Sequence, residues 1–254
     1  MKSRRLPVES ELIPYAAGFP PGNRWLVLAP HPDDEVFGIG ATLALGVRRG
    51  VEAHVVVVTD GGAQGTPAER EREARAAAAA LGLAEPEFWR FPDRSLSPDD
   101  PVLRGRLLEA MKHRSPDVVF VTSPVELHPD HRALAMAVQR AVRALSFLGL
   151  RRGGLDSVAA YEVGTPLRPN LLVAADEGWE SKRRAIACYA GQIAARPYDQ
   201  VTEALGTFRT LTLEGVGKAE AFHLERARRI AHLSSRRWAS LMGVPPAAAA
   251  RRSG

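Results

Sequence analysis

Strand-like and helix-like segments alternate along the first 150 residues, and this alternation limits the fold more than any other feature. Three strand-like segments are rich in valine and leucine, as expected of strands covered on both faces: "RWLVLAP", "EAHVVVVTD" and "PDVVFVTSP". A shorter one, "EPEFWRFPD", enters a loop. Helical apolar spacing follows at 33–50, 68–82, 99–114 and 130–145. The repeated order predicts a Rossmann-like three-layer α/β/α fold with a mostly parallel sheet.

The pattern loosens after about residue 150. Segments 156–164 and 170–176 are strand-like, 178–193 is helix-like, and the C-terminal stretch predicts one more helix. A chain of 254 residues without an internal repeat suits one domain, predicted here over 1–243. The last residues, 244–254, include "PPAAAARRSG" and predict a disordered tail.

Positive charge is concentrated at the C-terminal end. The formal net charge of the chain is +5, and residues 217–254 hold eight basic and two acidic side chains. Aromatic residues are not interleaved with these bases, so we expect a solvated helix face and no nucleic-acid partner. An anionic or lipid-linked substrate is the alternative reason for this charge.

The sequence shows neither a membrane span nor an export signal. No apolar run approaches the roughly 20 residues that a spanning helix needs, and the N-terminus "MKSRRLPVES" has no apolar core. The single cysteine, Cys188, cannot form an internal disulfide. The expected location is the cytoplasm, by default.

Polar clusters follow three of the strand-like segments, at 31–35 ("HPDDE"), 59–65 ("TDGGAQG") and 126–132 ("ELHPDHR"). In an open α/β sheet the carboxyl ends of the strands form the ligand site, so we expect the clusters to meet there. Capping of a helix start accounts for one or two of the acids in "HPDDE". It does not account for His31, nor for a second cluster of histidine and aspartate.

The second cluster, "HPDH", places His128 and His131 three residues apart at a predicted helix start, where they can share a face. The alternative is again capping, with Asp130 as the cap and both histidines on the surface. Only these two and His31 belong at the predicted site. The other four histidines are expected to be structural: His54, His113, His223 and His232.

Two histidines and one aspartate form a ligand set that suits zinc and leaves a coordination position open for water. A second carboxylate next to that water serves as general base, and a third histidine stabilises the oxygen of a scissile carbonyl. The two clusters contain this whole set. The chemistry alone does not decide which of Asp33 and Asp34 is the ligand, because either can point inward from a helix start.

The chain resembles the LmbE-like, or PIG-L, zinc-dependent N-deacetylases, which act on N-acetylglucosaminyl compounds. The resemblance rests on "LAPHPDDEVFGIGATLA" and "ELHPDHRA", with weaker support from "TDGGAQG", "FPD", "YEVG", "KRRAIACYAGQ" and "GKAEAF". It implies an LmbE-like deacetylase fold and one zinc ion per chain, held by His31, Asp34 and His131. It also implies that Asp33 is the general base.

By the same resemblance, His128 polarises the carbonyl or protonates the leaving amine, and Asp130 orients His128. Glu35 is expected to bond backbone N–H groups or to support His31. Similar deacetylases hold sugar hydroxyls at the positions of Arg70 and Asp93. For Arg70, a helix pair with Glu73 is an equal alternative.

Two further substrate contacts are expected, from Glu162 in "YEVG" and from Gln192 in "YAGQ". The family often has histidine and serine where this chain has Tyr189 and Gly191, which affects contacts made there and not the zinc chemistry. Lys182 and Glu220 are expected to form structural ion pairs.

The predicted function is zinc-dependent removal of an N-acetyl group from an amino-sugar compound, whether a small conjugate, a lipid-linked sugar or a polysaccharide unit. An amidase for a larger acyl group and a non-catalytic, metal-stabilised sugar-binding module are the alternatives. A glycosyltransferase fits less well, because clustered histidines favour zinc over magnesium. A dinucleotide fingerprint, HExxH and G-x-S-x-G are absent from the sequence. A homo-oligomer is left open.

Overall fold

A mixed sheet of eight strands forms the centre of the molecule in the computed structural model, which describes residues 13–147 and 154–243. The strands are β1 (Ala16–Ala17), β2 (Arg24–Ala29), β3 (Glu52–Thr59), β4 (Glu87–Phe91), β5 (Val118–Thr122), β6 (Ser157–Tyr161), β7 (Leu171–Ala174) and β8 (Ala219–Arg226). Their order is β1-β7-β8-β6-β5-β2-β3-β4, and only β8 runs antiparallel to its neighbours. The predicted α/β fold is confirmed. The predicted tail at 244–254 lies outside the described residues.

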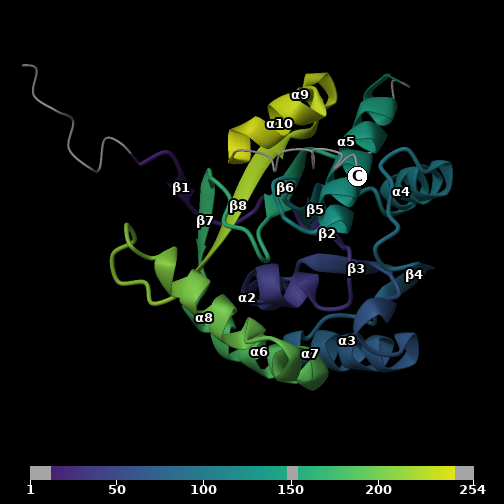
Figure 1. The fold of residues 1–254 in the computed structure, drawn as a ribbon. Helices are drawn as coiled ribbons and strands as arrows, with labels where there is room; N and C mark the ends of the chain where they lie inside the picture. The colour runs from purple at the N-terminus through teal and green to yellow at the C-terminus, as the bar shows by residue number, and fades with distance from the viewer. Residues whose placement is uncertain (1–12, 148–153, 244–254) are drawn as a thin grey trace, which may run out of the picture.

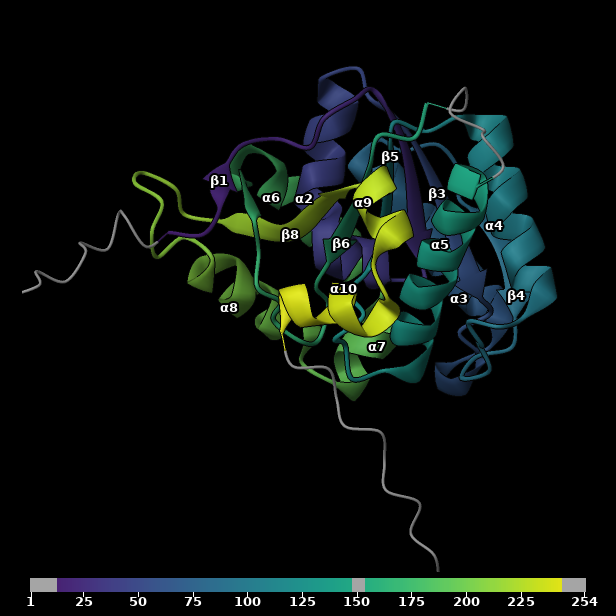
Figure 2. The ribbon, with the colours of Figure 1, turned by 90° about the horizontal axis from the view of Figure 1, so that it is seen from above.

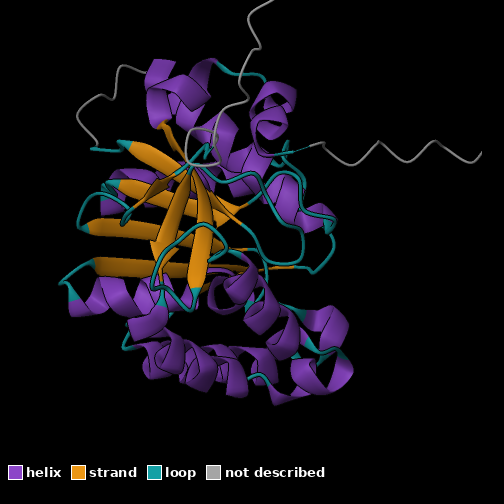
Figure 3. Ribbon diagram, turned by 90° about the vertical axis from the view of Figure 1, so that its left-hand side faces the viewer, coloured by secondary structure: helices purple, strands orange, loops and turns teal. Residues whose placement is uncertain are grey.

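Helices cover both faces of the sheet (Figure 1; Figure 3). They are α2 (Asp34–Arg48), α3 (Pro67–Leu81), α4 (Pro101–Arg114), α5 (Pro129–Phe147), α6 (Asp176–Ala187), α7 (Ala190–Ala195), α8 (Tyr198–Phe208), α9 (Ala227–His232) and α10 (Ser235–Met242). Helices α4, α5, α9 and α10 lie on one face (Figure 2), and α2, α3 and α6 on the other.

Alternate residues of the strands supply the two cores. In β2, Leu26 and Leu28 face the first group of helices, while Trp25 and Val27 face the second. All four are buried, so this strand has no polar face. The near-continuous apolar segments are therefore central parallel strands, as predicted.

Local signals in the sequence fix two helix starts. The Thr66 hydroxyl accepts the N–H of Glu69, whose carboxylate in turn bonds the backbone N–H of Thr66, and Pro67 begins α3. Gly82 ends this helix in the left-handed conformation, at a φ of 78°. Asp100 caps α4 by accepting two backbone N–H groups.

The C-terminal third differs from the sequence prediction. The predicted final helix is wrong in part, because residues 219–226 form strand β8, which inserts between β6 and β7 before α9 and α10 begin. The segment "AEAFHLER" has residues that favour helices, but two strand neighbours and burial outweigh this preference. The single helix predicted over 178–193 is divided into α6 and α7 around Cys188 and Tyr189.

A buried ion pair joins β8 to α2 and α6. The Nζ of Lys182 lies 2.6 Å from Oε1 of Glu220, and both side chains are 2% exposed. The Glu220 carboxylate also accepts the N–H groups of Ala41 and Thr42, just after a non-helical residue, Ile39, breaks the regular bonding of α2. The expected structural role of Lys182 and Glu220 is confirmed.

Candidate active site

A cavity of about 590 Å³ opens at the carboxyl ends of β2–β6. All three predicted clusters contribute to its lining, together with the loop after β6 and the segment from α7 to α8. Of the histidines, the lining includes only His31, His128 and His131 among the described residues. The four histidines expected to be structural do not line it.

The acids of "HPDDE" do not cap their own helix. Asp33 occupies the N-cap position of α2 but makes no side-chain cap bond. Oδ2 of Asp34 instead accepts the backbone N–H of His31. The two carboxylates are therefore available for a site, and the capping alternative for this cluster is not what the structure shows.

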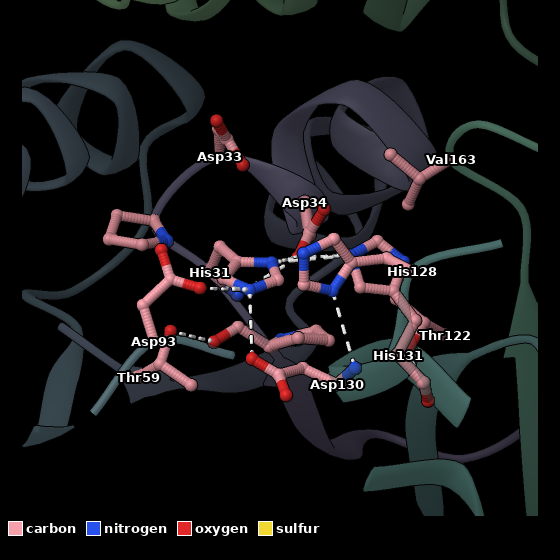
Figure 4. A network of polar contacts seen from close by, with 12 residues as sticks. His31, Asp33, Asp34, Thr59, Asp93, Thr122, His128, Asp130, His131 and Val163 are labelled. Carbon is pink, nitrogen blue, oxygen red and sulfur yellow. Dashed lines mark hydrogen bonds and ion pairs between the residues drawn. The ribbon is translucent and has the colours of Figure 1, made fainter. Parts of the chain in front are cut away.

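Three potential metal ligands converge at the cavity floor, on His31, Asp34 and His131 (Figure 4). Nδ1 of His31 lies 3.0 Å from Oδ2 of Asp34, and Nε2 of His131 lies 3.1 Å from the same oxygen. The two nitrogens are 3.2 Å apart. Although burial acts to raise it, the neighbouring His131 and His31 hold the pKa of Asp34 far below its ordinary range, so it is a carboxylate.

This triangle fits zinc. Ligands at about 2.0–2.1 Å from a tetrahedral zinc ion lie about 3.3 Å from one another. Two imidazoles and one carboxylate are also the donor set of catalytic zinc sites, with one position left for water or substrate. His31, Asp34 and His131 would hold the ion, as the resemblance implied.

Two other sets of potential ligand atoms also meet at His31. One combines His31 with His128 and His131, but Nδ1 of His128 already accepts the backbone N–H of Asp130. The other combines His31 with Asp93 and Asp130, but both oxygens of Asp130 already accept backbone N–H groups. Oδ2 of Asp34 accepts one backbone N–H as well, that of His31, but Oδ1 of Asp34 accepts none in the described part of the chain, so the triangle is the set that could still hold an ion.

Asp130 contacts His31 with its side chain, and not His128 as expected. Its Oδ2 lies 3.3 Å from Nε2 of His31 and accepts the N–H of Arg94, while Oδ1 accepts the N–H of Leu96. A carboxylate at Nε2 keeps the proton there and leaves Nδ1 free for a metal. The expected role of Asp130 is corrected accordingly, because only its backbone N–H reaches His128.

Asp130→Asn is expected to weaken zinc binding by about 10-fold, the low end for such a partner, because His31 loses one of the two carboxylates at its Nε2 and keeps Asp93. The measurement is zinc competition with a chelating dye. His128→Ala is the matched comparison and is expected to keep its zinc affinity. An Asp130→Asn variant with unchanged zinc affinity and slower turnover would restore the original assignment to His128.

Asp93 supplies a second carboxylate at Nε2 of His31. Its Oδ1 lies 3.2 Å from Nε2 of His31, and its Oδ2 accepts the N–H of Ala63. The contact with His31 lowers the pKa of Asp93 to about 2, although burial opposes this. Asp93 lines the cavity, as expected of a sugar-binding residue, and also supports His31.

Asp33 lines the same cavity and is held by Arg70. Nη2 of Arg70 donates to Oδ2 of Asp33 over 2.8 Å, and Nη1 bonds Glu73 over 2.9 Å. Arg70 thus makes the helix pair that was the alternative, and an unpredicted contact with Asp33. Burial and the charge of Asp34 raise the pKa of Asp33 to about 6, against the opposing effect of Arg70.

The backbone of Asp33 has a φ of 150°, a conformation that residues with side chains rarely adopt. Such strain costs about 1–3 kcal/mol and is concentrated at functional sites. Its effect here is to leave the Asp33 carboxylate beside Arg70 while Asp34 faces the histidines (Figure 4).

His128 is a neutral donor. Its Nδ1 accepts the Asp130 N–H over 3.2 Å, so the proton of the neutral ring is on Nε2. Burial, His31 and His131 lower the pKa of His128. The ring lies edge-on to His31, with 4.5 Å between ring centroids.

Of the two further residues expected to contact the substrate, one lines the cavity and the other does not. Gln192 is buried, lines the cavity and donates from its side chain to the Gln64 carbonyl. Glu162 does not line the cavity: its carboxylate bonds Arg209 and the N–H of Leu167. It has a structural contact in place of the expected substrate contact.

Glu35 keeps one of its two expected roles, because the backbone N–H groups of Glu35 itself and of Asp33 act on its carboxylate and oppose the rise of its pKa. Its Oε1 lies 3.5 Å from the hydroxyl of Tyr189, and Oε2 has no hydrogen-bond partner in the described part of the chain. Burial raises the pKa of Glu35 to about 8. It therefore does not support His31 directly.

Glu126 is the main residue that sequence reasoning missed. It is 2% exposed, accepts the N–H groups of Val163, Gly164 and Thr165, and lies 3.8 Å from Nδ1 of His131. At this distance the carboxylate makes no hydrogen bond to His131, whose Nδ1 has no partner in the described part of the chain, but it places a negative charge beside the ring. Its place at the start of "ELHPDHR" was the available signal, because residues just after a strand reach the site.

The basic C-terminal residues that the structure describes, within 217–243, do not bring positive charge to the cavity. Arg226 and Arg229 are paired with Asp156 and Glu225, and no base from residues 217–243 lines the cavity. None of the described helices combines the length and the hydrophobicity that crossing a membrane requires.

Residues 26–142 match the family described as GlcNAc-PI de-N-acetylase, or PIG-L. This segment contains both histidine–aspartate clusters of the cavity. Over this segment, which is a little under half of the chain, the sequence is similar to the PIG-L family. The diacetylchitobiose deacetylase of Thermococcus kodakarensis is 28% identical over 188 residues, which cover 66% of this chain and 69% of that protein.

Solved structures match the fold as well. A conserved protein of Thermus thermophilus is 32% identical with a TM-score of 0.69, over 78% of this chain and 93% of the other. The 4-carboxy-2-hydroxymuconate hydratase of Pseudomonas putida is 25% identical with a TM-score of 0.66, over 80% and 96%. Because a hydratase is among the matches, the activity must be argued from the site.

Proposed function

We propose that this chain is a zinc-dependent N-deacetylase that hydrolyses the acetamide of an N-acetylglucosaminyl compound. The observation that supports it most is the triangle of His31, Asp34 and His131, with Asp33 and His128 on the same cavity. A binding module has no need of a second carboxylate beside the ligands. The match to the PIG-L family model and the similarity to a diacetylchitobiose deacetylase favour hydrolysis of an amide over hydration of a carbon–carbon double bond.

When bound, zinc acts as a Lewis acid that makes water more acidic and polarises a carbonyl oxygen. Asp33 accepts the proton of the attacking water, and its raised pKa suits a general base. The Nε2–H of His128 donates to the acetyl oxygen as negative charge develops there. The proton held by Asp33 then passes to the leaving nitrogen, which gives acetate and a free amine.

The substrate hydroxyls are assigned to Asp93 and Gln192, which line the cavity with Asp33. Arg70 also lines the cavity. Because it is bonded to the carboxylates of Asp33 and Glu73, we assign it the role of holding Asp33 in position and not a direct contact with the substrate. We place the reaction in the cytoplasm, on the basis of the sequence. An oligomer is not part of the proposal.

The test is acetate and amine release from N-acetylglucosamine conjugates, with the protein first stripped of metal by a chelator and then reloaded with zinc. The stripped protein is expected to be inactive, and about one equivalent of zinc to restore turnover, because the triangle forms one three-ligand site. Full activity in protein shown to be free of metal contradicts the proposal. Stoichiometric zinc without turnover of any conjugate supports the binding module.

A second candidate is an amidase for a longer acyl group, and one observation favours it. Part of the cavity wall is apolar: Phe37 is stacked on Tyr198 with 5.3 Å between ring centroids, and Val201 also lines the cavity. Comparing N-acetyl and N-butanoyl glucosamine in the same assay separates the two functions. Faster cleavage of the longer acyl group supports the amidase.

A further inference from the structure

Helix α8 forms part of the cavity wall but packs only lightly on the rest of the protein. Tyr198 and Val201, in its first turn, line the cavity. Only two of its eleven residues are buried. Helices in proteins are held mainly by the packing of one face, so α8 depends on polar contacts as well. One of them, between Glu203 and Arg183, joins the middle of α8 to α6.

A second ion pair joins the end of α8 to the loop after β6. Arg209, which directly follows α8, donates from Nε to Oε1 of Glu162 over 2.9 Å and from Nη2 to Oε2. The exposed fraction is 9% for the Arg209 side chain and 3% for that of Glu162. Both residues also bond the backbone of Leu167. A two-point contact of this kind fixes the orientation of the partners as well as their distance.

The loop after β6 is itself fixed to the sheet. Its residues 163–165 line the cavity and donate their three backbone N–H groups to Glu126, which lies just after β5. Glu126 therefore holds the loop, and Arg209 holds α8 against the loop. The pair of Arg209 and Glu162 does not line the cavity, but it sets the separation of two segments that do.

Both segments contribute apolar side chains to the cavity lining: Val163 from the loop, and Tyr198 and Val201 from α8. The hydroxyls of an amino sugar need polar partners, which were assigned above to Asp93 and Gln192. The acyl group of the amide is the part of the substrate that apolar side chains bind. We therefore place the acyl group against α8 and the loop after β6.

We propose that the ion pair of Arg209 and Glu162 limits the length of the acyl group that the enzyme removes, because it holds α8 against the loop after β6. This inference rests on the N-deacetylase function proposed above. Both residues are positioning residues, since neither touches the substrate. An apolar pocket discriminates between ligands that differ by one methylene by about 10–200-fold. A pocket whose wall is held loosely loses part of this discrimination, so longer acyl groups gain relative to acetyl.

The test measures kcat/KM of the zinc-loaded, full-length protein for glucosamine that carries an N-acetyl, N-butanoyl, N-hexanoyl or N-octanoyl group. In wild type, kcat/KM is expected to fall by about tenfold or more at one of the longer chains. In the double variant Arg209→Ala with Glu162→Gln, the ratio of kcat/KM between that chain and acetyl is expected to rise by about tenfold, mainly through KM.

The double variant leaves no unpaired charge buried, and glutamine still accepts the N–H of Leu167. Arg209→Lys is a milder variant, which keeps the cation without the two-point contact and should give an intermediate ratio. It carries the test if the double variant does not fold. The control is Arg24→Ala, which breaks the ion pair with Asp117 at the start of β2, away from the cavity lining. The control should leave the ratio unchanged.

The outcomes separate this inference from the function on which it rests. A ratio of kcat/KM does not depend on the fraction of protein that is folded, so a loss of stability alone lowers all four values equally. Such an equal loss overturns the inference, as does a wild type that is indifferent to acyl length, and both leave the deacetylase standing. A wild-type protein that releases amine from none of the four substrates overturns the proposed function and this inference with it.

Discussion

Asp33→Asn is expected to bind zinc normally and to lose turnover by about 10²–10⁴-fold, the contribution of a positioned general base. Asparagine has the shape of aspartate and keeps an oxygen for Arg70, but it cannot accept the proton of water. It also tolerates unusual φ values about as well as aspartate, so the φ of 150° adds little new strain. The measurements are zinc content and kcat on the same preparation.

The control for this change is Asp99→Asn, which makes the same substitution at an exposed acid near the start of α4. It is expected to keep full activity. Loss of zinc from Asp33→Asn would mean that Asp33 is the ligand, and that the roles of the two aspartates must be exchanged. Unchanged zinc and unchanged turnover would remove Asp33 from the mechanism.

The parallel half of the sheet could be predicted because its signals are local. An almost continuous apolar strand such as β5 has few alternatives, and Thr66, Gly82 and Asp100 mark helix boundaries within one turn. Strand β8 could not be predicted in this way. Its eight residues favour a helix locally, and only the space between β6 and β7 makes them a strand.

The candidate site shows the same division. Which residues meet at the sheet edge followed from the sequence, because polar clusters after parallel strands share one edge. The sequence did not predict which residue orients which histidine. The carboxylate of Asp130 faces away from its sequence neighbour His128 because the N–H groups of Arg94 and Leu96, which lie far earlier in the chain, hold it beside His31. Contacts between separate loops of this kind leave no periodic trace in a sequence.

Lys182→Met is expected to lower the free energy of unfolding by about 3–5 kcal/mol, the cost of leaving the partner of a buried ion pair without its counter-charge. Methionine fills the space of the lysine stem. It leaves the Glu220 carboxylate buried at 2% exposure without its cation, while the N–H groups of Ala41 and Thr42 still require an acceptor. Urea unfolding near neutral pH measures the change.

A second substitution tests this cause. In Lys182→Met with Glu220→Gln, the amide carbonyl still accepts an N–H of α2 and no buried charge remains, so part of the lost stability should return. Lys112→Met, at an exposed site in the last turn of α4, is the matched control and should change stability by no more than about 0.5 kcal/mol. A double variant as unstable as the sum of its single variants would show that the lysine acts through packing. A Lys182→Met loss as small as that of Lys112→Met would show that the pair contributes little to holding β8 against α2.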